Sequence, residues 1–179
     1  MKYLLFLAIK SQGKKASGFT LIELLVVVVI LGVLAAVGLP NLLGQVSKAR
    51  QAEAIAILGQ INRAQQAYRY ENGTFARLDQ LPISGIDTAK FYTFRDDPNV
   101  LPTGILSSYR AEARPEFTNE IKNYAGGVLL RPDDVSGRVL PIICEAISPL
   151  QDNVFVNGSG GCSNQSIQLQ GPVVVLNPI

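Results

Sequence analysis

The sequence predicts an α+β fold: a long N-terminal α-helix, half exposed and apolar and half packed, followed by a head built on a small antiparallel β-sheet. Three observations support this prediction. Residues 24–47 carry no charged side chain. An amphipathic stripe follows them directly, and beyond residue 72 short apolar runs alternate with prolines. Together these features predict one helix, apolar in its first half and amphipathic in its second, and one β-rich head.

Residues 1–18 form a basic leader. They hold four of the 16 basic residues and none of the 14 acidic ones, so removing them changes the net charge from +2 to 12 − 14 = −2. A secretion signal normally has its small-residue cleavage site after the apolar region, whereas Gly18 precedes it. A cut at Gly18 therefore leaves the apolar segment on the mature chain. A slightly acidic mature chain predicts no direct nucleic-acid site.

Residues 19–47 form the apolar half of the helix. The 24 charge-free residues span roughly 36 Å as a helix, enough to cross a bilayer. The lysines before them place the leader in the cytoplasm and the rest of the chain outside. Gly32, Gly38, Pro40 and Gly44 weaken this helix. They indicate either ordinary membrane-helix composition or a segment that kinks or melts when the helix leaves lipid for a protein assembly.

Residues 48–72 form the amphipathic half, which we expect to pack on the head. Polar residues such as Asn62 and Gln66 fall largely off the stripe, and Asn72-Gly73 ends the helix. The apolar stripe recurs at spacings of three and four residues: Ala54, Ile57, Leu58, Ile61, Ala64 and Tyr68.

Residues 73–179 form the head. Pro141, inside one of its apolar runs, predicts an edge position or a bulge. Asp96-Asp97 and Asp133-Asp134 could hold a cation, but their neighbours favour solvated turns. The candidate strands are Phe91–Phe94, Tyr109–Ala113, Gly127–Leu130, Val139–Cys144 and Val173–Leu176.

The chain has two cysteines, Cys144 and Cys162, and no histidine. If the head is exported, the cysteines favour one disulfide bounding the C-terminal loop 144–162 over two free thiols. Without histidine, the commonest general base and metal ligand is missing. We therefore predict no catalytic residue, no metal, no cofactor and no enzyme activity.

Glu23 is a carboxylate at the start of the apolar helix, and two interpretations stand. It is tolerated because it lies shallow and near a helix N-terminus, which favours an anion. Alternatively, a cut after Gly18 frees the amine of Phe19, which pairs with Glu23 of the next copy in a bundle. An unpaired buried charge is so unfavourable that such pairing fixes one axial register.

The junction resembles a known pattern. Lys14 to Gly18, followed by Phe19-Thr20-Leu21-Ile22-Glu23 and an apolar run, is similar to the class III leader junction of type IV pilins and pseudopilins. Asn62–Tyr68, Glu71–Phe75, Tyr124–Val128 and Ile143–Ala146 resemble cyanobacterial pilins and the pilin-like G/H family. The resemblance implies the type IV pilin fold, with its disulfide-bounded C-terminal loop.

The resemblance also implies a function. A prepilin peptidase cuts between Gly18 and Phe19 and N-methylates Phe19, Glu23 pairs with a neighbouring amine, and the helix bends or melts near Pro40. The expected protein is a pilin that starts in the inner membrane, meets a pilus assembly platform and joins a homo-oligomeric extracellular filament for adhesion, motility or DNA uptake. The alternatives are a minor pilin, a pseudopilin of a type II secretion machine, or a membrane-tethered binding module.

Overall fold

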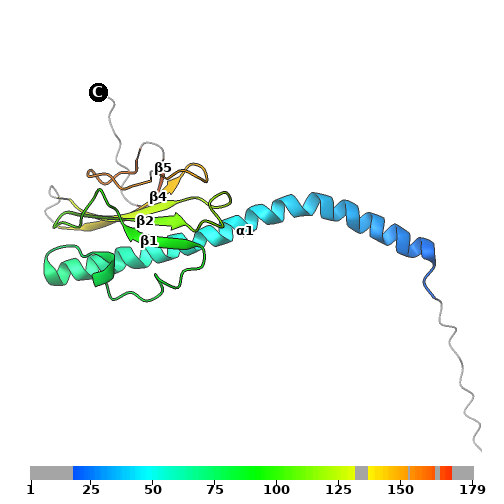
Figure 1. The fold of residues 1–179 in the computed structure, drawn as a ribbon, viewed down its shortest axis with the longest axis horizontal. Coiled ribbons are helices and arrows are strands. Elements are labelled where there is room, and N and C mark those ends of the chain that lie inside the picture. The colour runs from blue at the N-terminus through cyan, green and yellow to red at the C-terminus, as the bar shows by residue number, and fades with distance from the viewer. Residues whose placement is uncertain (1–17, 132–136, 153, 164–165, 171–179) are drawn as a thin grey trace, which may run out of the picture. The chain divides into compact units, whose positions relative to one another are not determined.

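The computed structural model describes residues 18–131, 137–152, 154–163 and 166–170, without the side chains of residues 40, 41 and 170. These residues form an α-helix, α1 (Leu21–Asn72), a 3-10 turn, η1 (Leu78–Gln80), and five strands. The strands are β1 (Tyr92–Asp96), β2 (Leu106–Ala113), β3 (Tyr124–Leu130), β4 (Val139–Ala146) and β5 (Ser166–Gln170). The chain divides into two compact units, residues 1–42 and 43–179, and α1 contributes to both (Figure 1).

The helix α1 has 52 residues and is continuous from Leu21 to Asn72. It begins at Leu21, two residues after the predicted start. At its other end Gly73 has a φ of 75°, and the Gly73 N–H donates to the Arg69 carbonyl at 2.8 Å. Glycine adopts this left-handed conformation without steric cost, which is why the helix stops at the predicted Asn72-Gly73 pair.

The five strands form one antiparallel sheet in the sequential order β1-β2-β3-β4-β5. Four of the five predicted apolar runs lie within or overlap β1 to β4. The fifth, Val173–Leu176, lies outside the described residues. Strand β5 was not predicted, because its sequence SIQLQ alternates polar with apolar residues and is only five residues long.

Pro141 lies in β4, opposite Val128 of β3. Among the described residues, β5 pairs with β4 only from Ile143 to Ala146, with a bulge between Ile143 and Cys144. Pro141 therefore lies in a part of β4 for which the described partner is β3 alone. Because residues 171–179 lie outside the described part of the chain, the predicted edge position of Pro141 stays a prediction; the bulge that the structure does show lies two residues farther along β4, between Ile143 and Cys144.

Apolar side chains cover both faces of the sheet. On one face Leu58 and Ile61 of α1 pack with Tyr92 and Tyr109, and on the other the segment after β4 supplies Val154 and Val156. Figure 1 shows α1 on one side of the sheet and this segment on the other. Because β3 is enclosed from both sides, six of its seven residues are buried.

Two glycines of β3 let the layers approach closely. A Cβ on Gly126 would lie 2.4 Å from Cε2 of Tyr109 and 2.9 Å from Cδ2 of Leu58, on the helix side. A Cβ on Gly127 would lie 2.8 Å from the Ser107 carbonyl and 3.1 Å from Cγ2 of Val156. Successive strand residues face opposite sides, so each glycine serves one of the two packed layers.

Candidate functional site

The N-terminus of α1 is held by a reciprocal capping box between Thr20 and Glu23. The Glu23 carboxylate accepts hydrogen bonds from the Thr20 N–H at 3.0 Å and the Thr20 hydroxyl at 2.9 Å, and the Glu23 N–H donates to Thr20 Oγ1 at 3.3 Å. This arrangement satisfies N–H groups that a helix start otherwise leaves without partners. Both residues are exposed.

The capping box is a role for Glu23 that the sequence analysis missed. The signal was present, since Thr-x-x-Glu before an apolar run is the pattern of a capping box. In this uncut chain the Phe19 nitrogen belongs to a peptide bond, and the Phe19 side chain is 86% exposed. The pairing of a free Phe19 amine with Glu23 of another copy therefore stays a prediction, as does the cut after Gly18.

The first half of α1 presents apolar side chains in every direction. Its most apolar window has a mean hydropathy of 2.9 and is 0% buried, and by length and composition alone the helix could cross a membrane. In water such exposure is unfavourable by about 25 cal/mol for each Å² of apolar surface left uncovered. The surface needs a lipid or protein neighbour. Its large members are Leu21, Ile22, Leu24, Leu25, Val26, Val27, Val28, Val29, Ile30, Leu31, Val33, Leu34, Val37, Leu39, Leu42 and Leu43.

The glycines of this half are not required by packing within the described structure. A Cβ on Gly32, Gly38 or Gly44 would have no described neighbour within 4 Å. The backbone of α1 is helical through Pro40, whose side chain lies outside the described set. Kinking or melting in an assembly thus stays a prediction.

The second half of α1 is joined to the head where the helix first contacts it. The Glu53 carboxylate accepts the Lys90 and Phe91 N–H groups, each at 2.8 Å, just before β1. The Arg50 guanidinium pairs with Glu120 and lies 4.8 Å from the Phe117 ring centroid and 5.5 Å from that of Phe91. Sequence spacing gave no sign of these contacts, which join positions 37 to 70 residues apart.

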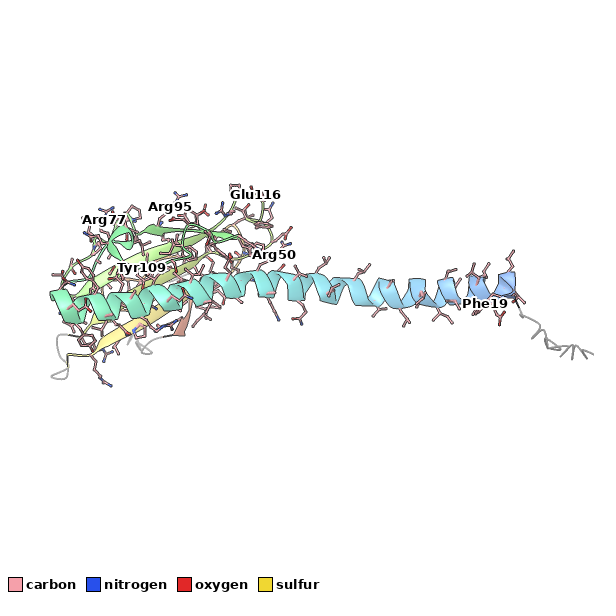
Figure 2. The ribbon with its side chains drawn as sticks, turned by 90° about the horizontal axis from the view of Figure 1, so that it is seen from below. Phe19, Arg50, Arg77, Arg95, Tyr109 and Glu116 are labelled. Carbon is pink, nitrogen blue, oxygen red and sulfur yellow. A yellow bond between two sulfur atoms is a disulfide. The ribbon has the colours of Figure 1, made fainter. Side chains whose placement is uncertain are left out.

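Buried polar side chains hold α1 on the sheet farther along. Asn62 is 2% exposed, which corrects its predicted place off the packed face: it accepts the Tyr109 hydroxyl and donates to the Ile142 carbonyl at 3.3 Å. Gln65 donates to the Ala76 carbonyl at 2.6 Å and accepts the Ala76 N–H at 3.0 Å. Burial raises the pKa of Tyr109 well above its ordinary value, so the hydroxyl stays protonated and able to donate. Figure 2 shows Tyr109 beside α1.

The disulfide between Cys144 and Cys162 is present. Cys144 is fully buried in the core on the face of the sheet away from α1, and Cys162 packs against the same cluster. An isolated bridge pairs Cys162 with Val156. The bond thus fixes the segment after β4 against the sheet and closes the loop 144–162.

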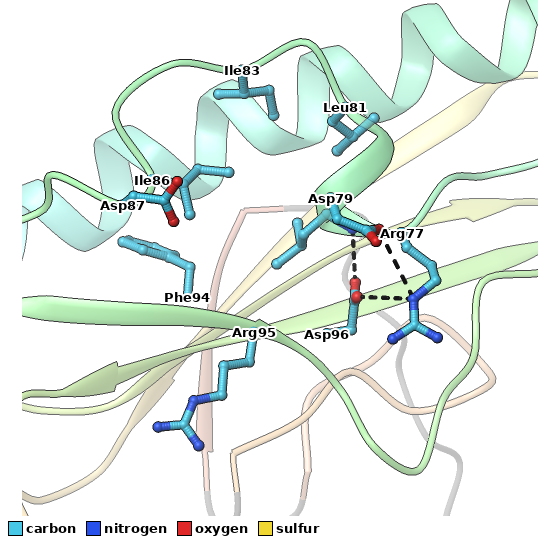
Figure 3. A pocket seen from close by; sticks show the side chains of 10 residues that line it. Arg77, Asp79, Leu81, Ile83, Ile86, Asp87, Phe94, Arg95 and Asp96 are labelled. Atoms are coloured by element: carbon cyan, nitrogen blue, oxygen red, sulfur yellow. Dashed lines mark hydrogen bonds and ion pairs between the residues drawn. The ribbon is translucent and has the colours of Figure 1, made fainter.

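A cavity of about 590 Å³ lies beside β1, between η1, the loop that follows it and the strand (Figure 3). Asp96 accepts the Leu78 N–H at 3.1 Å and pairs with Arg77, whose Nε lies 3.6 Å from Oδ2. The lining holds no cysteine, serine or histidine; its carboxylates are Asp79, Asp87 and Asp96, and Arg77 pairs with the first and the last of them. Its apolar members are Leu78, Leu81, Ile83, Ile86 and Phe94, and the charged members are Arg77, Asp79, Asp87, Arg95 and Asp96.

Asp97 corrects the prediction of a solvated turn. It is 1% exposed and its carboxylate accepts from Arg110 at 3.0 Å, from the Asn99 N–H at 3.0 Å and from the Ser108 hydroxyl at 3.5 Å. A buried carboxylate needs such partners, and Arg110 lies 13 residues away in the sequence. Asp133 and Asp134 lie outside the described residues. Among the residues that are described, no group of three His, Cys, Asp or Glu side chains could hold a metal ion.

Comparison with known protein families gave two matches. The family described as type IV pilin-like G and H matches residues 51–162, and the prokaryotic N-terminal methylation motif matches residues 13–39. No solved structure matches the chain.

Several curated proteins are similar over part of their length. The type II secretion system core protein G of Vibrio cholerae serotype O1 is 43% identical over 67 residues, covering 37% of this chain and 46% of that protein. That of Aeromonas hydrophila is 39% identical over 69 residues, with 38% and 48% covered. The type IV wide pilus major component PilA4 of Thermus thermophilus is 40% identical over 71 residues, with 40% and 54% covered. The chain thus matches about half the length of these relatives.

Proposed function

Because this chain belongs to the type IV pilin-like G and H family, whose members are structural subunits and not enzymes, we propose that it is a subunit of a type IV pilus. The observation that carries this proposal is the contrast along α1. From Ala54 onward one face of the helix packs on the disulfide-bonded head, whereas its described residues 21–39 and 42–46 are exposed and largely apolar. Copies of such a chain bury their bare segments by packing them together as a filament core, with the heads outside.

We propose that the chain begins as a membrane-anchored precursor. Residues 1–18 are the cytoplasmic leader, 19–47 the span in the inner membrane, 48–72 the packed half of the helix, and 73–179 the head outside. A prepilin peptidase cuts between Gly18 and Phe19 and methylates the new amine, which the match to the N-terminal methylation motif supports. An assembly platform then moves the subunit into an extracellular filament that serves adhesion, motility or DNA uptake.

In the filament, Glu23 pairs with the Phe19 amine of a neighbouring copy. The capping box supports this pairing because its hydrogen bonds from Thr20 keep the Glu23 carboxylate at the N-terminal end of its own helix. In an apolar filament core, an unpaired carboxylate costs several kcal/mol, so the pairing selects one stagger between neighbours. Helix melting around Gly32, Gly38, Pro40 and Gly44 would let the packed half adjust to that stagger.

A pseudopilin of a type II secretion system is the second candidate. The observation that favours it is that several curated relatives, among them those of Vibrio cholerae and Aeromonas hydrophila, carry the name type II secretion system core protein G. The proposal of a type IV pilus subunit is supported by the similarity to PilA4 of Thermus thermophilus, a type IV wide pilus major component. Recovery in sheared surface filaments at wild-type expression distinguishes the two, because only a pilin is expected there in quantity.

Glu23→Gln tests the assembly role of the charge. Glutamine can keep the capping hydrogen bond but cannot pair with an amine as an ion. We expect the variant to insert into the membrane at the wild-type level and to be absent from sheared filaments. Glu71→Gln, an exposed carboxylate near the end of the same helix, is the matched control and should assemble normally. Filaments of Glu23→Gln at the wild-type yield would contradict the proposal.

A further inference from the structure

The turn after β4 holds two large aliphatic side chains in solvent. Ile147 is 57% exposed and Leu150 is 64% exposed. Leu150 has a φ of 68° and is the one non-glycine residue with positive φ in the described part of the chain. Glycine or asparagine adopts this conformation at lower cost than leucine. Neither backbone conformation nor core packing therefore explains why a leucine stands here.

The turn is held in place by hydrogen bonds. The Ile147 N–H donates to Gln151 Oε1 at 2.9 Å, and Asn123 donates from Nδ2 to the Gln151 carbonyl at 3.0 Å. The Asn123 carbonyl accepts the Ala146 N–H at 3.0 Å. The aliphatic side chains are thus presented by a turn fixed to the connection before β3.

This turn lies at the end of the sheet where α1 enters the unit 43–179. Tyr124, at the start of β3, pairs with Glu145, two residues before Ile147, and the Tyr124 hydroxyl donates to Gln51 Oε1 at 3.0 Å. Figure 2 shows Arg50 at this end of the head and Arg77 at the opposite end. The turn and the first head-contacting residues of α1 therefore share one end of the unit.

Chain connectivity sets the depth of this end relative to a bilayer. Gln51 is four residues after Ser47, the last residue of the charge-free stretch, which is roughly 6 Å along a helix. The polar headgroup region on each side of a bilayer is of about the same thickness. Exposed Lys48 and Lys90 lie at the same end, Lys90 through its backbone contact with Glu53, and so do the exposed carboxylates Glu116 and Glu120, of which Glu120 pairs with Arg50. The charges at this end are therefore mixed, and the depth of the turn, not charge, points to the lipid surface.

We propose that the turn Ile147–Leu150 is a second membrane contact, which inserts its two aliphatic side chains into the lipid surface while the precursor waits in the membrane. The proposal rests on the proposed membrane-inserted precursor. The bilayer is the occupant because the same helix that anchors the chain brings this turn to headgroup level. The contact orients the head against the membrane and is broken when the subunit is extracted into a filament.

Tryptophan fluorescence tests this contact, because the chain contains no tryptophan. Full-length Leu150→Trp is reconstituted into vesicles of phosphatidylcholine and phosphatidylglycerol. In one set of vesicles the lipid acyl chains carry bromine atoms close to the headgroup, and in the other they carry none. Leu101→Trp is the matched control. Leu101 is 63% exposed and lies two residues from Thr103, whose carbonyl accepts the Phe75 N–H at 3.1 Å near the far end of α1. Val28→Trp, in the apolar half of α1, reports insertion.

We expect brominated lipid to quench Leu150→Trp and Val28→Trp and to leave Leu101→Trp unchanged. If Val28→Trp is quenched and Leu150→Trp is not, the membrane contact is refuted while the inserted precursor stands. If Leu150→Trp emission shifts to the blue without quenching, protein covers the turn, as in contact with a second copy, and the proposal is also overturned. If Val28→Trp is not quenched, the inserted precursor itself fails, and the contact with it.

A second variant separates a lipid contact from a structural role. Leu150→Gly removes the side chain and suits the positive φ, so we expect it to raise the unfolding temperature of the full chain in detergent. A fall in the unfolding temperature would show that Leu150 serves the fold, and would overturn the proposal.

Discussion

Replacing Tyr109 by phenylalanine tests how the long helix is held on the sheet. Tyr109 is fully buried and its hydroxyl donates to the side-chain oxygen of Asn62. The substitution keeps the ring, and so its packing against α1, but leaves a buried amide oxygen without that donor. Leaving such a group without its partner costs about 1–3 kcal/mol.

The expected loss is large enough to measure by thermal unfolding. At about 4 °C for each kcal/mol in a domain of this size, the unfolding temperature should fall by roughly 4–12 °C. The assay is circular dichroism of the oxidised full chain in detergent micelles. Tyr70→Phe is the matched control, because Tyr70 is on the same helix and 76% exposed, and it should change stability by less than about 0.5 kcal/mol.

A double-mutant cycle isolates the hydrogen bond. With Asn62→Leu in the background, Tyr109→Phe should cost less, because the buried amide is gone, and the coupling should be about 0.5–3 kcal/mol. Equal stability of Tyr109→Phe and Tyr70→Phe, or a coupling of zero, would refute the view that this buried pair holds helix and sheet together.

Three further predictions concern the packing, the disulfide and the buried tyrosines. Gly126→Ala should destabilise the head by about 1–3 kcal/mol because its Cβ would meet Tyr109 at 2.4 Å. Gly59→Ala is the control, because its Cβ would have Arg63 Nη1 at 3.7 Å as its nearest described neighbour, and it should stabilise the helix by about 0.5–1 kcal/mol. Urea unfolding measures both variants. A Gly126→Ala protein more stable than Gly59→Ala would contradict the packing described. Replacing both Cys144 and Cys162 by alanine should cost about 3 kcal/mol in the same assay, from the entropy of the opened loop, and an unchanged urea midpoint would argue against a stabilising bond. Burial raises the pKa of Tyr92, Tyr109 and Tyr124, so stability should be fully present below about pH 10, where the unfolded side chains begin to ionise, and fall as the pH rises further. Tyr109→Phe should show a shallower fall, and a slope equal to that of the wild type would refute the contribution of this residue.

The helix, the disulfide and most of the sheet could be predicted because their signals are local. A charge-free run and an apolar stripe give α1, Gly73 gives its end, and short apolar runs give four strands. The two cysteines favoured one intramolecular disulfide on the condition that the head is exported. Strand β5 was not predicted, because a strand of five alternating residues, paired on one side only among the described residues, differs little in sequence from a loop.

The polar contacts could not be predicted because they join residues far apart in the sequence. Asn62 is polar on an amphipathic helix, and only the approach of Tyr109, 47 residues later, makes a buried position favourable. Asp97 is buried for the same reason, through Arg110. The capping box of Thr20 and Glu23 is different, since its Thr-x-x-Glu pattern spans only four residues and could have been predicted from the sequence.

The central claim is that this chain becomes a filament subunit by losing residues 1–18 and burying its bare helix against other copies. Intact-mass measurement of filaments sheared from the cell surface tests it most directly. We predict that the dominant species has the mass of residues 19–179 with one methyl group at Phe19 and the Cys144–Cys162 bond formed. Recovery of the chain only from membranes, uncut at Gly18 and absent from sheared filaments, would contradict the claim.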